Sequence, residues 1–278
     1  MSPLDPSLAL LTLPASQSLP LVVAVPHAGR DYGPRFTASI PLGADERRIT
    51  EDAFADELAT LAPEKGAPLL KALFPRIWLD VNRDQRELDP LLIRDELPVG
   101  SLPTTANVRA GLGVVPRLLT GGRPIYSTLL SLEEIESRLA LGWRPYHETL
   151  MALVEETRQR FKHCILIDCH SMPTTRENDP PDIVLGDNFG TACDHRLVAL
   201  AENFFKRLGF RVMRNKPYAG GFTTRHYGQP NLGVHALQIE IRRGLYMNEQ
   251  RFEPSPALPE LASHLGELFR QLGNLDIR

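Results

Sequence analysis

Continuous apolar runs mark the strongest predicted strands, over residues 21–25, 164–168 and 235–241. Runs of this length with little polar alternation are typical of strands buried on both faces of a parallel sheet. Weaker apolar runs predict four further strands, over residues 69–74, 77–81, 182–186 and 210–213.

Apolar residues that recur every three or four positions predict helices between these strands. Pro145 interrupts one such segment, and a proline inside a helix kinks or splits it. Because strands alternate with helices, we expect an α/β layer fold around a mixed, mainly parallel sheet. The expected helices cover residues 132–142, 145–161, 195–208 and 258–273, and a further helix begins near Thr50.

The chain is 278 residues long, and no segment has the composition of a linker between domains. We therefore expect a single catalytic domain over residues 1–278. Residues 88–130 are rich in proline, glycine and threonine and show little periodicity. This region is predicted to be an irregular excursion or a lid.

Composition and charge exclude several classes of protein. The residues are 42% hydrophobic and 23% charged with a net charge of −3, so disorder is excluded and nothing draws the chain to nucleic acid or an anionic membrane. No apolar run approaches the roughly 20 residues of a membrane helix, and the N-terminus resembles no signal peptide. The three cysteines form neither a disulfide framework nor a zinc ribbon. A cytoplasmic location is expected.

Polar residues that could take part in catalysis or in metal binding follow or end the predicted strands. His27 follows the first strand, Asn82 and Arg83 follow another, His170 comes just after 164–168, and Glu240 lies in the last. Ligands of open α/β sheets bind outside the carboxyl ends of the strands. Four strands thus deliver functional residues to what is expected to be one edge of the sheet.

Two histidines and a carboxylate are the ligands of a catalytic zinc ion that keeps one position for water. His27 and His170 are the candidate histidines, and Glu51 or Asp52 is the candidate acid. Each residue also has a structural interpretation, because a histidine at a strand end can cap it and acids at a helix start offset the helix dipole. Asp168, two residues before His170, either orients that histidine or ends its strand.

Glu240 lies in an apolar strand, where a carboxylate must pair with a cation or shift its pKa. It is either a partner of a nearby arginine or a general base, and strand alternation places Arg242 on its face. Arg83, Arg225 and Arg242 could form a pocket for a dicarboxylate, because guanidinium groups bind carboxylates in bidentate fashion. The neighbouring Arg243 is expected at the surface.

Six segments lie in order along residues 20–250. They are Pro26-His27-Ala28-Gly29, Asp80-Val81-Asn82-Arg83-Asp84, Asp168-Cys169-His170-Ser171-Met172, Gly186-Asp187, Tyr218-Ala219-Gly220-Gly221-Phe222-Thr223 and Gln238-Ile239-Glu240-Ile241-Arg242-Arg243. Together these segments resemble the N-formylglutamate amidohydrolase family. This resemblance implies a three-layer α/β fold of the phosphorylase/hydrolase-like type, similar to zinc carboxypeptidases, with helices on both faces of the sheet.

The resemblance also implies an activity, the zinc-dependent hydrolysis of N-formyl-L-glutamate to formate and L-glutamate in histidine degradation. One Zn²⁺ per chain would be held by His27, His170 and an acid, with Asp52 favoured over Glu51. Glu240 corresponds to the general base of the family.

The same resemblance implies residues that bind the substrate, a small N-acyl amino dicarboxylate. Asn82 and Arg83 would hold the α-carboxylate, and Arg225 or Arg242 the γ-carboxylate. Two alternatives stay open, a related metallo-hydrolase of another N-acyl amino acid or short peptide, and a carboxylate-binding protein without catalysis. The sequence does not fix the oligomeric state.

Overall fold

The computed structural model describes residues 5–175 and 180–277. Contacts divide the chain into two compact units. Unit 1 contains the residues up to Leu10 together with Pro26–Glu51 and Lys71–Thr149. Unit 2 contains Leu11–Val25, Asp52–Leu70 and the residues from Leu150 onward. The single catalytic domain over residues 1–278 stays a prediction.

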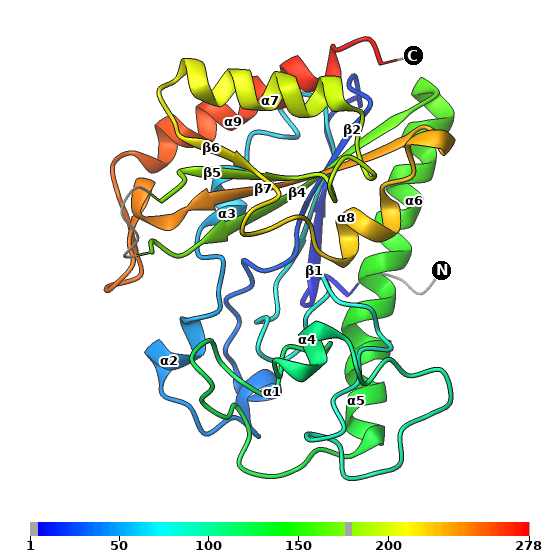
Figure 1. Cartoon of the computed structure of the whole chain (residues 1–278), viewed down its shortest axis with the longest axis vertical. Coiled ribbons are helices and arrows are strands. Elements are labelled where there is room, and N and C mark those ends of the chain that lie inside the picture. Colours follow the sequence, from blue (N-terminus) through cyan, green and yellow to red (C-terminus); the bar gives the residue numbers. More distant parts are fainter. Residues whose placement is uncertain (1–4, 176–179, 278) are drawn as a thin grey trace. The chain divides into compact units, whose positions relative to one another are not determined.

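One seven-stranded sheet has the order β1-β3-β2-β4-β7-β5-β6 (Figure 1). Strands β2, β4 and β7 pair in parallel, whereas β5 runs antiparallel to β7 and parallel to β6. The predicted α/β fold with a mixed, mainly parallel sheet is confirmed. The strands are β1 (Ala9–Thr12), β2 (Leu21–Val25), β3 (Leu69–Ala72), β4 (Cys164–Met172), β5 (Ile183–Gly186), β6 (Val212–Arg214) and β7 (Val234–Arg242).

Helices cover both faces of the sheet within unit 2. Helices α7 (His195–Arg207) and α9 (Leu258–Gly273) pack together over one face, and α8 (Phe222–Tyr227) contacts β7 on the other (Figure 1). Both long helices match their predictions, because the apolar stripe of each faces the core. In α9 the buried stripe consists of Leu258, Leu261, Ala262, Leu265, Leu268, Phe269 and Leu272. No helix among the described residues is long and apolar enough to cross a membrane.

Strands β4 and β7 form the centre of the sheet and are nine residues long each. The predicted strand 164–168 was too short, since β4 continues to Met172 and stays buried throughout. The parallel register pairs His170 with Glu240 and Met172 with Arg242. His170 therefore lies inside a strand rather than after it.

Residues 77–81 do not form the predicted strand. The backbone turns instead, with the amides of Trp78 and Leu79 both donating to the carbonyl of Pro75. The apolar side chains that suggested a strand are buried all the same. Backbone carbonyls of this turn accept hydrogen bonds from side chains rather than from a neighbouring strand, as the carbonyl of Trp78 does from Arg138.

The prediction of two helices, over 132–142 and 145–161, is confirmed in part, because two α-helices form but a π-helical turn joins them without a break just before Pro145. Helix α5 (Leu132–Arg138) passes into a π-helix, η1 (Leu139–Trp143), and then into α6 (Arg144–Phe161). Pro145 is the second residue of α6, where the wider π turn before it accommodates the missing N–H. Gly142 fits here because a Cβ would lie 2.6 Å from a methyl group of Leu79.

The helix expected from Thr50 begins later, as α3 (Ala55–Leu58). Phe54 before it has a φ of 62°, in the left-handed region, so the chain cannot be helical through this point. Glu51 and Asp52 therefore precede the helix and are not part of its first turn.

The remaining elements are short. Residues 88–130 contain α4 (Ala106–Arg109), turns and isolated bridges, and their role as a lid stays a prediction. The others are α1 (Pro34–Thr37), α2 (Ala44–Arg48), η2 (Pro230–Leu232), η3 (Arg243–Leu245), β8 (Met247–Asn248) and β9 (Glu253–Pro254).

Candidate metal centre

His170 of β4 lies between two carboxylates of unit 2. Its Nε2 is 3.0 Å from Asp168 and its Nδ1 is 2.9 Å from Asp52. All three side chains are buried. Burial alone would lower the pKa of His170, but Asp168, Asp52 and Glu240 outweigh it and raise that pKa well above its ordinary value. The site thus favours positive charge at this position.

Asp52 is also held from its other side. Its Oδ1 accepts a hydrogen bond of 3.2 Å from Arg243, whose Nε donates to the hydroxyl of Ser171 at 3.0 Å. The expectation of an exposed Arg243 was wrong, because its side chain is buried. The strand ends at Arg242, and the 3₁₀ turn η3 that follows redirects Arg243. The Asp52 carboxylate is therefore fixed in orientation.

Glu240 of β7 is positioned by a neighbour on its own strand. Its Oε1 accepts a hydrogen bond of 2.8 Å from the amide nitrogen of Gln238, and the amide oxygen of Gln238 accepts 2.7 Å from the backbone N–H of Gly221. Both side chains are buried. Sequence reasoning missed Gln238, although a polar residue two positions from a buried carboxylate shares its face of the strand.

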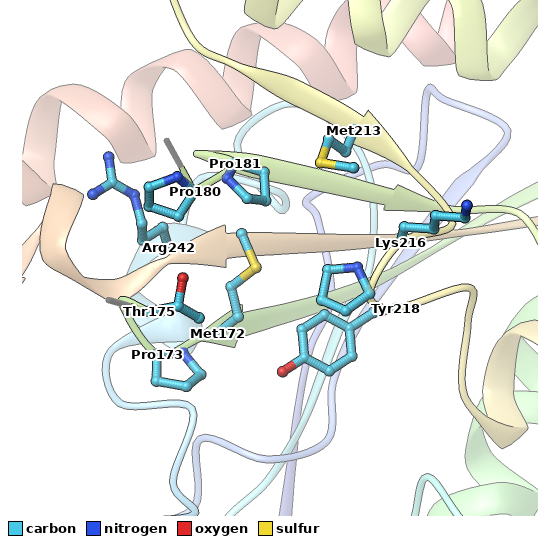
Figure 2. A pocket seen from close by; sticks show the side chains of 10 residues that line it. Met172, Pro173, Thr175, Pro180, Pro181, Met213, Lys216, Tyr218 and Arg242 are labelled. Carbon is cyan, nitrogen blue, oxygen red and sulfur yellow. The ribbon is translucent and has the colours of Figure 1, made fainter. Parts of the chain in front are cut away.

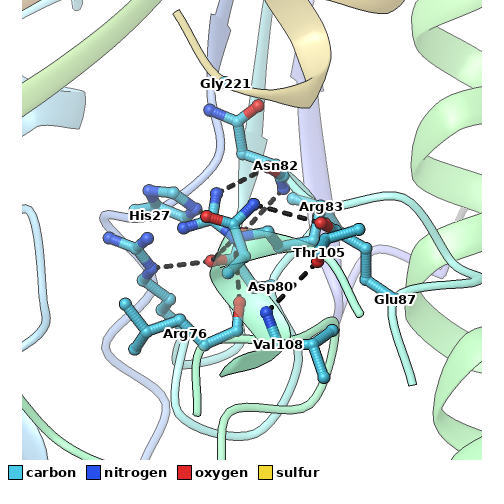
Figure 3. Close-up of polar contacts among 12 residues, drawn as sticks. His27, Arg76, Asp80, Asn82, Arg83, Glu87, Thr105, Val108 and Gly221 are labelled. Carbon is cyan, nitrogen blue, oxygen red and sulfur yellow. Dashed lines mark hydrogen bonds and ion pairs between the residues drawn. The ribbon is translucent and has the colours of Figure 1, made fainter. Parts of the chain in front are cut away.

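In unit 1, His27 is bound by a carboxylate that sequence reasoning also missed. Its Nε2 is 2.7 Å from Asp80, which also accepts from Arg76 and from the backbone N–H of Asn82, both at 2.8 Å (Figure 3). Burial would raise the pKa of Asp80, but Arg76, His27 and Arg83 hold it well below its usual range. Asp80 is therefore ionised.

The loop that carries His27 depends on a glycine. A Cβ at Gly29 would lie 2.1 Å from the backbone oxygen of Phe74, so no other residue allows this close approach. The backbone N–H of Asp31 donates to the carbonyl of Leu73 in the same stretch. The His27 loop is thereby fixed against residues 73–74 of its own unit.

The two histidines share one hydrogen-bonding pattern. Each presents Nε2 to a carboxylate of its own unit, Asp80 for His27 and Asp168 for His170. Such a bond places the proton on Nε2 and leaves the lone pair of Nδ1 for a metal ion. Imidazole nitrogens with a free lone pair and a buried carboxylate are the donor types that suit zinc.

Glu51, the alternative acid, has different partners. Its carboxylate accepts from the Nε of Arg48 at 3.0 Å and from the hydroxyl of Tyr32 at 3.1 Å, all within unit 1. Arg48 binds both carboxylate oxygens of Glu51, whereas Arg243 binds only Oδ1 of Asp52, and Oδ2 of Asp52 lies 2.9 Å from Nδ1 of His170. This arrangement favours Asp52 over Glu51 as the acid.

The predicted substrate-binding residues lie in both units. In unit 1, the guanidinium of Arg83 donates to the carbonyls of Leu112 and Asn82 at 3.0 and 2.9 Å. In unit 2, Arg225 of α8 is exposed and donates to the carbonyl of Gly220 at 2.8 Å. Arg242 forms an ion pair with Asp182. The substrate contacts of all four residues, Asn82, Arg83, Arg225 and Arg242, stay predictions.

Comparisons with known proteins agree with one another. The family model described as N-formylglutamate amidohydrolase matches residues 19–247. N-formylglutamate deformylase of Pseudomonas aeruginosa is 33% identical over 262 residues, which cover 91% of each chain. The crystal structure of N-formylglutamate amidohydrolase from Ralstonia eutropha JMP134 has a TM-score of 0.90 and 33% identity, covering 96% of this chain and 97% of that one.

Proposed function

The chain belongs to the N-formylglutamate amidohydrolase family, and we propose from this premise that it hydrolyses N-formyl-L-glutamate to formate and L-glutamate. Its relatives make it a hydrolase of a C–N amide bond. The observation that carries the proposal is the similarity to a named deformylase over 91% of both chains. The reaction would serve histidine degradation.

We also propose that His27, Asp52 and His170 hold one zinc ion through the two Nδ1 atoms and the carboxylate. The support is the pattern of carboxylates bound to Nε2 of each histidine and the burial of all three side chains. A zinc ion in such a site lowers the pKa of bound water toward about 7 and polarises the carbonyl to be cleaved. The hydrogen bond from Arg243 would keep the Asp52 carboxylate oriented to bind the zinc ion.

Glu240 is the proposed general base. It is the parallel-strand neighbour of His170, and adjacent strands lie roughly 4.8 Å apart, so a base at Glu240 stands beside a candidate ligand. Its carboxylate would take a proton from the attacking water and deliver it to the leaving nitrogen. The hydrogen bond from Gln238 fixes the carboxylate, which reduces the reorganisation needed for this transfer.

The arginines would hold the two carboxylates of the substrate. Arg83 is proposed for the α-carboxylate with Asn82, because two backbone carbonyls already orient its guanidinium. Arg225 or Arg242 is proposed for the γ-carboxylate. A substrate held at both ends presents its formamide in a fixed position, which lowers the entropic part of the barrier.

Release of formate from N-formylglutamate by purified protein tests the function, with N-acetylglutamate and N-formylaspartate as competing substrates. We expect fastest turnover of N-formylglutamate, loss of activity on chelation, and recovery when zinc is restored. Full activity after complete removal of metal would contradict the zinc proposal. Turnover of another N-acyl amino acid alone would support a related metallo-hydrolase, and glutamate binding without turnover would support a binding protein.

A further inference from the structure

A cavity of about 370 Å³ lies in unit 2, beside the ends of β4 and β7 (Figure 2). This volume is within the range of roughly 300–1,000 Å³ that encloses small organic ligands. Its walls are mainly apolar and include Met172, Met213, Tyr218 and the adjacent prolines Pro180 and Pro181. Methionine side chains adapt to irregular apolar ligands, so such walls suit a carbon-rich group.

The register of the strands places this cavity next to the proposed catalytic residues. Met172 pairs with Arg242, and both line the cavity, whereas His170 pairs with Glu240 two positions earlier. Side chains two residues apart share a face of the strand and are separated by roughly 6.6 Å. A ligand group in the cavity would therefore lie next to Glu240, displaced along β7 by about the spacing of two residues.

The charges around the cavity are unequal. Arg242 forms an ion pair with Asp182. Lys216 also lines the cavity, and within residues 5–175 and 180–277 it has no ion-pair partner. Figure 2 shows Lys216 and Arg242 on opposite sides of Met172. The cavity thus combines apolar walls with a lysine, Lys216, that has no ion-pair partner among the described residues.

We propose that this cavity binds an organic carboxylate with an apolar body, such as an aryl or branched alkyl group. The apolar body fills the space between Met172 and Met213, and the carboxylate pairs with Lys216. This inference rests on the proposed function, and it extends the substrate class beyond N-formyl-L-glutamate. The cavity admits acylated amino acids whose side chain is longer and more apolar than that of glutamate.

The test uses the full chain carrying ¹³C-methyl methionine and the probe 4-phenylbutyrate, followed by NMR. We expect saturable shifts of the Met172 and Met213 methyl signals, with Met151, exposed on α6, unchanged as the internal control. Butyrate should bind more weakly because it lacks the ring. The cation 4-phenylbutylamine should bind more weakly because Lys216 repels it.

Two variants separate the apolar and the charged contributions. Met213 is partly exposed, so Met213→Trp should fill the cavity without unfolding the chain and abolish binding. Lys216→Gln should weaken binding about fivefold, the effect of one exposed ion pair of about 1 kcal/mol. Lys206→Gln removes an exposed lysine of α7 and should leave binding unchanged.

Three results would overturn the proposal. They are methionine signals that do not respond to 4-phenylbutyrate, equal binding of the amine, and unchanged binding by Lys216→Gln. Turnover of N-formylglutamate is measured on the same preparations. Turnover without probe binding refutes the cavity proposal alone, and probe binding without turnover refutes the proposed function alone.

Discussion

His27 and His170 are held in the same way by very different parts of the molecule. His170 lies in the middle of the sheet, where parallel neighbours on both sides fix β4, and Asp168 precedes it on the same face. His27 follows β2 in a loop, and its carboxylate, Asp80, lies in a turn outside any strand or helix. Regular backbone pairing supports one histidine, and individual side-chain contacts support the other.

The turn around Asp80 shows how irregular structure can be equally well defined. Its carbonyls accept from buried side chains, as Ile77 does from Tyr126 and Val81 does from His147. Its amides are also used, since the N–H of Asp80 donates to the carbonyl of Val114 at 2.8 Å. Each of these hydrogen bonds depends on one particular residue, whereas the bonds of a sheet form a repeating ladder between strands. One substitution should therefore disturb the turn more than the sheet.

Asp80→Ala should give the largest effect. It removes the partner of His27 and of Arg76 together, and loss of one member of a buried ion pair costs about 3–5 kcal/mol in the free energy of unfolding. Urea unfolding followed by circular dichroism measures this. Glu155→Ala, which breaks an exposed pair with Arg158, is the control and should lower the free energy of unfolding far less. Equal effects of the two variants would remove the contrast between the turn and an ordinary surface pair.

Asp168→Asn should change metal affinity more than stability. The sheet keeps β4 in place, but the carboxylate that fixes Nε2 of His170 is lost, and loss of such a partner costs roughly 10–100-fold in metal affinity. Competition for zinc with a chelating dye measures the affinity. Unchanged affinity would show that Asp168 does not orient a ligand.

Gln238→Ala should lower kcat by about tenfold, a cost of about 1.4 kcal/mol for a general base that is no longer held in place. KM should change little, because the residue acts through Glu240 rather than on substrate. Steady-state kinetics on N-formylglutamate separate the two constants. A rise of KM at constant kcat would assign Gln238 to substrate binding instead.

Asp194→Ala should give the smallest effect. It measures how much a carboxylate at the end of a regular helix contributes to stability. Asp194 caps α7, and loss of such a cap costs about 1 kcal/mol. Its hydrogen bonds to Arg196 lower its pKa from 3.8 to about 2, so the stabilisation is present above pH 3.8 and is lost as the pH falls through about 2. Thermal unfolding of both proteins between pH 2 and pH 6 should show the difference in Tm vanish at the acid end. A constant difference would contradict this assignment.

Sequence periodicity predicted the regular strands and helices around His170, but it failed for the irregular turn around Asp80. Strands β2 and β7 and helices α7 and α9 were predicted closely, because burial against a sheet imposes a repeating pattern on them. The turn at 77–81 carries the same apolar composition as a strand, and only its contacts with Tyr126, Arg138 and His147 decide its shape.

The candidate site divides in the same way. Residue type and position at the predicted strand ends selected His27, His170 and Glu240, and the family resemblance favoured Asp52 over Glu51. The partners Asp80, Gln238 and Arg243 act through tertiary contacts that no local pattern encodes. Arg243 in particular follows the strand by one residue, and only the 3₁₀ turn after Arg242 turns it inward to Asp52.

Anomalous diffraction from crystals of the zinc-loaded protein tests the central claim most directly. The account predicts one zinc ion per chain, bound by Nδ1 of His27, Nδ1 of His170 and the carboxylate of Asp52. Zinc bound through Nε2 of either histidine, zinc at other residues, or no anomalous peak at these three side chains would contradict it.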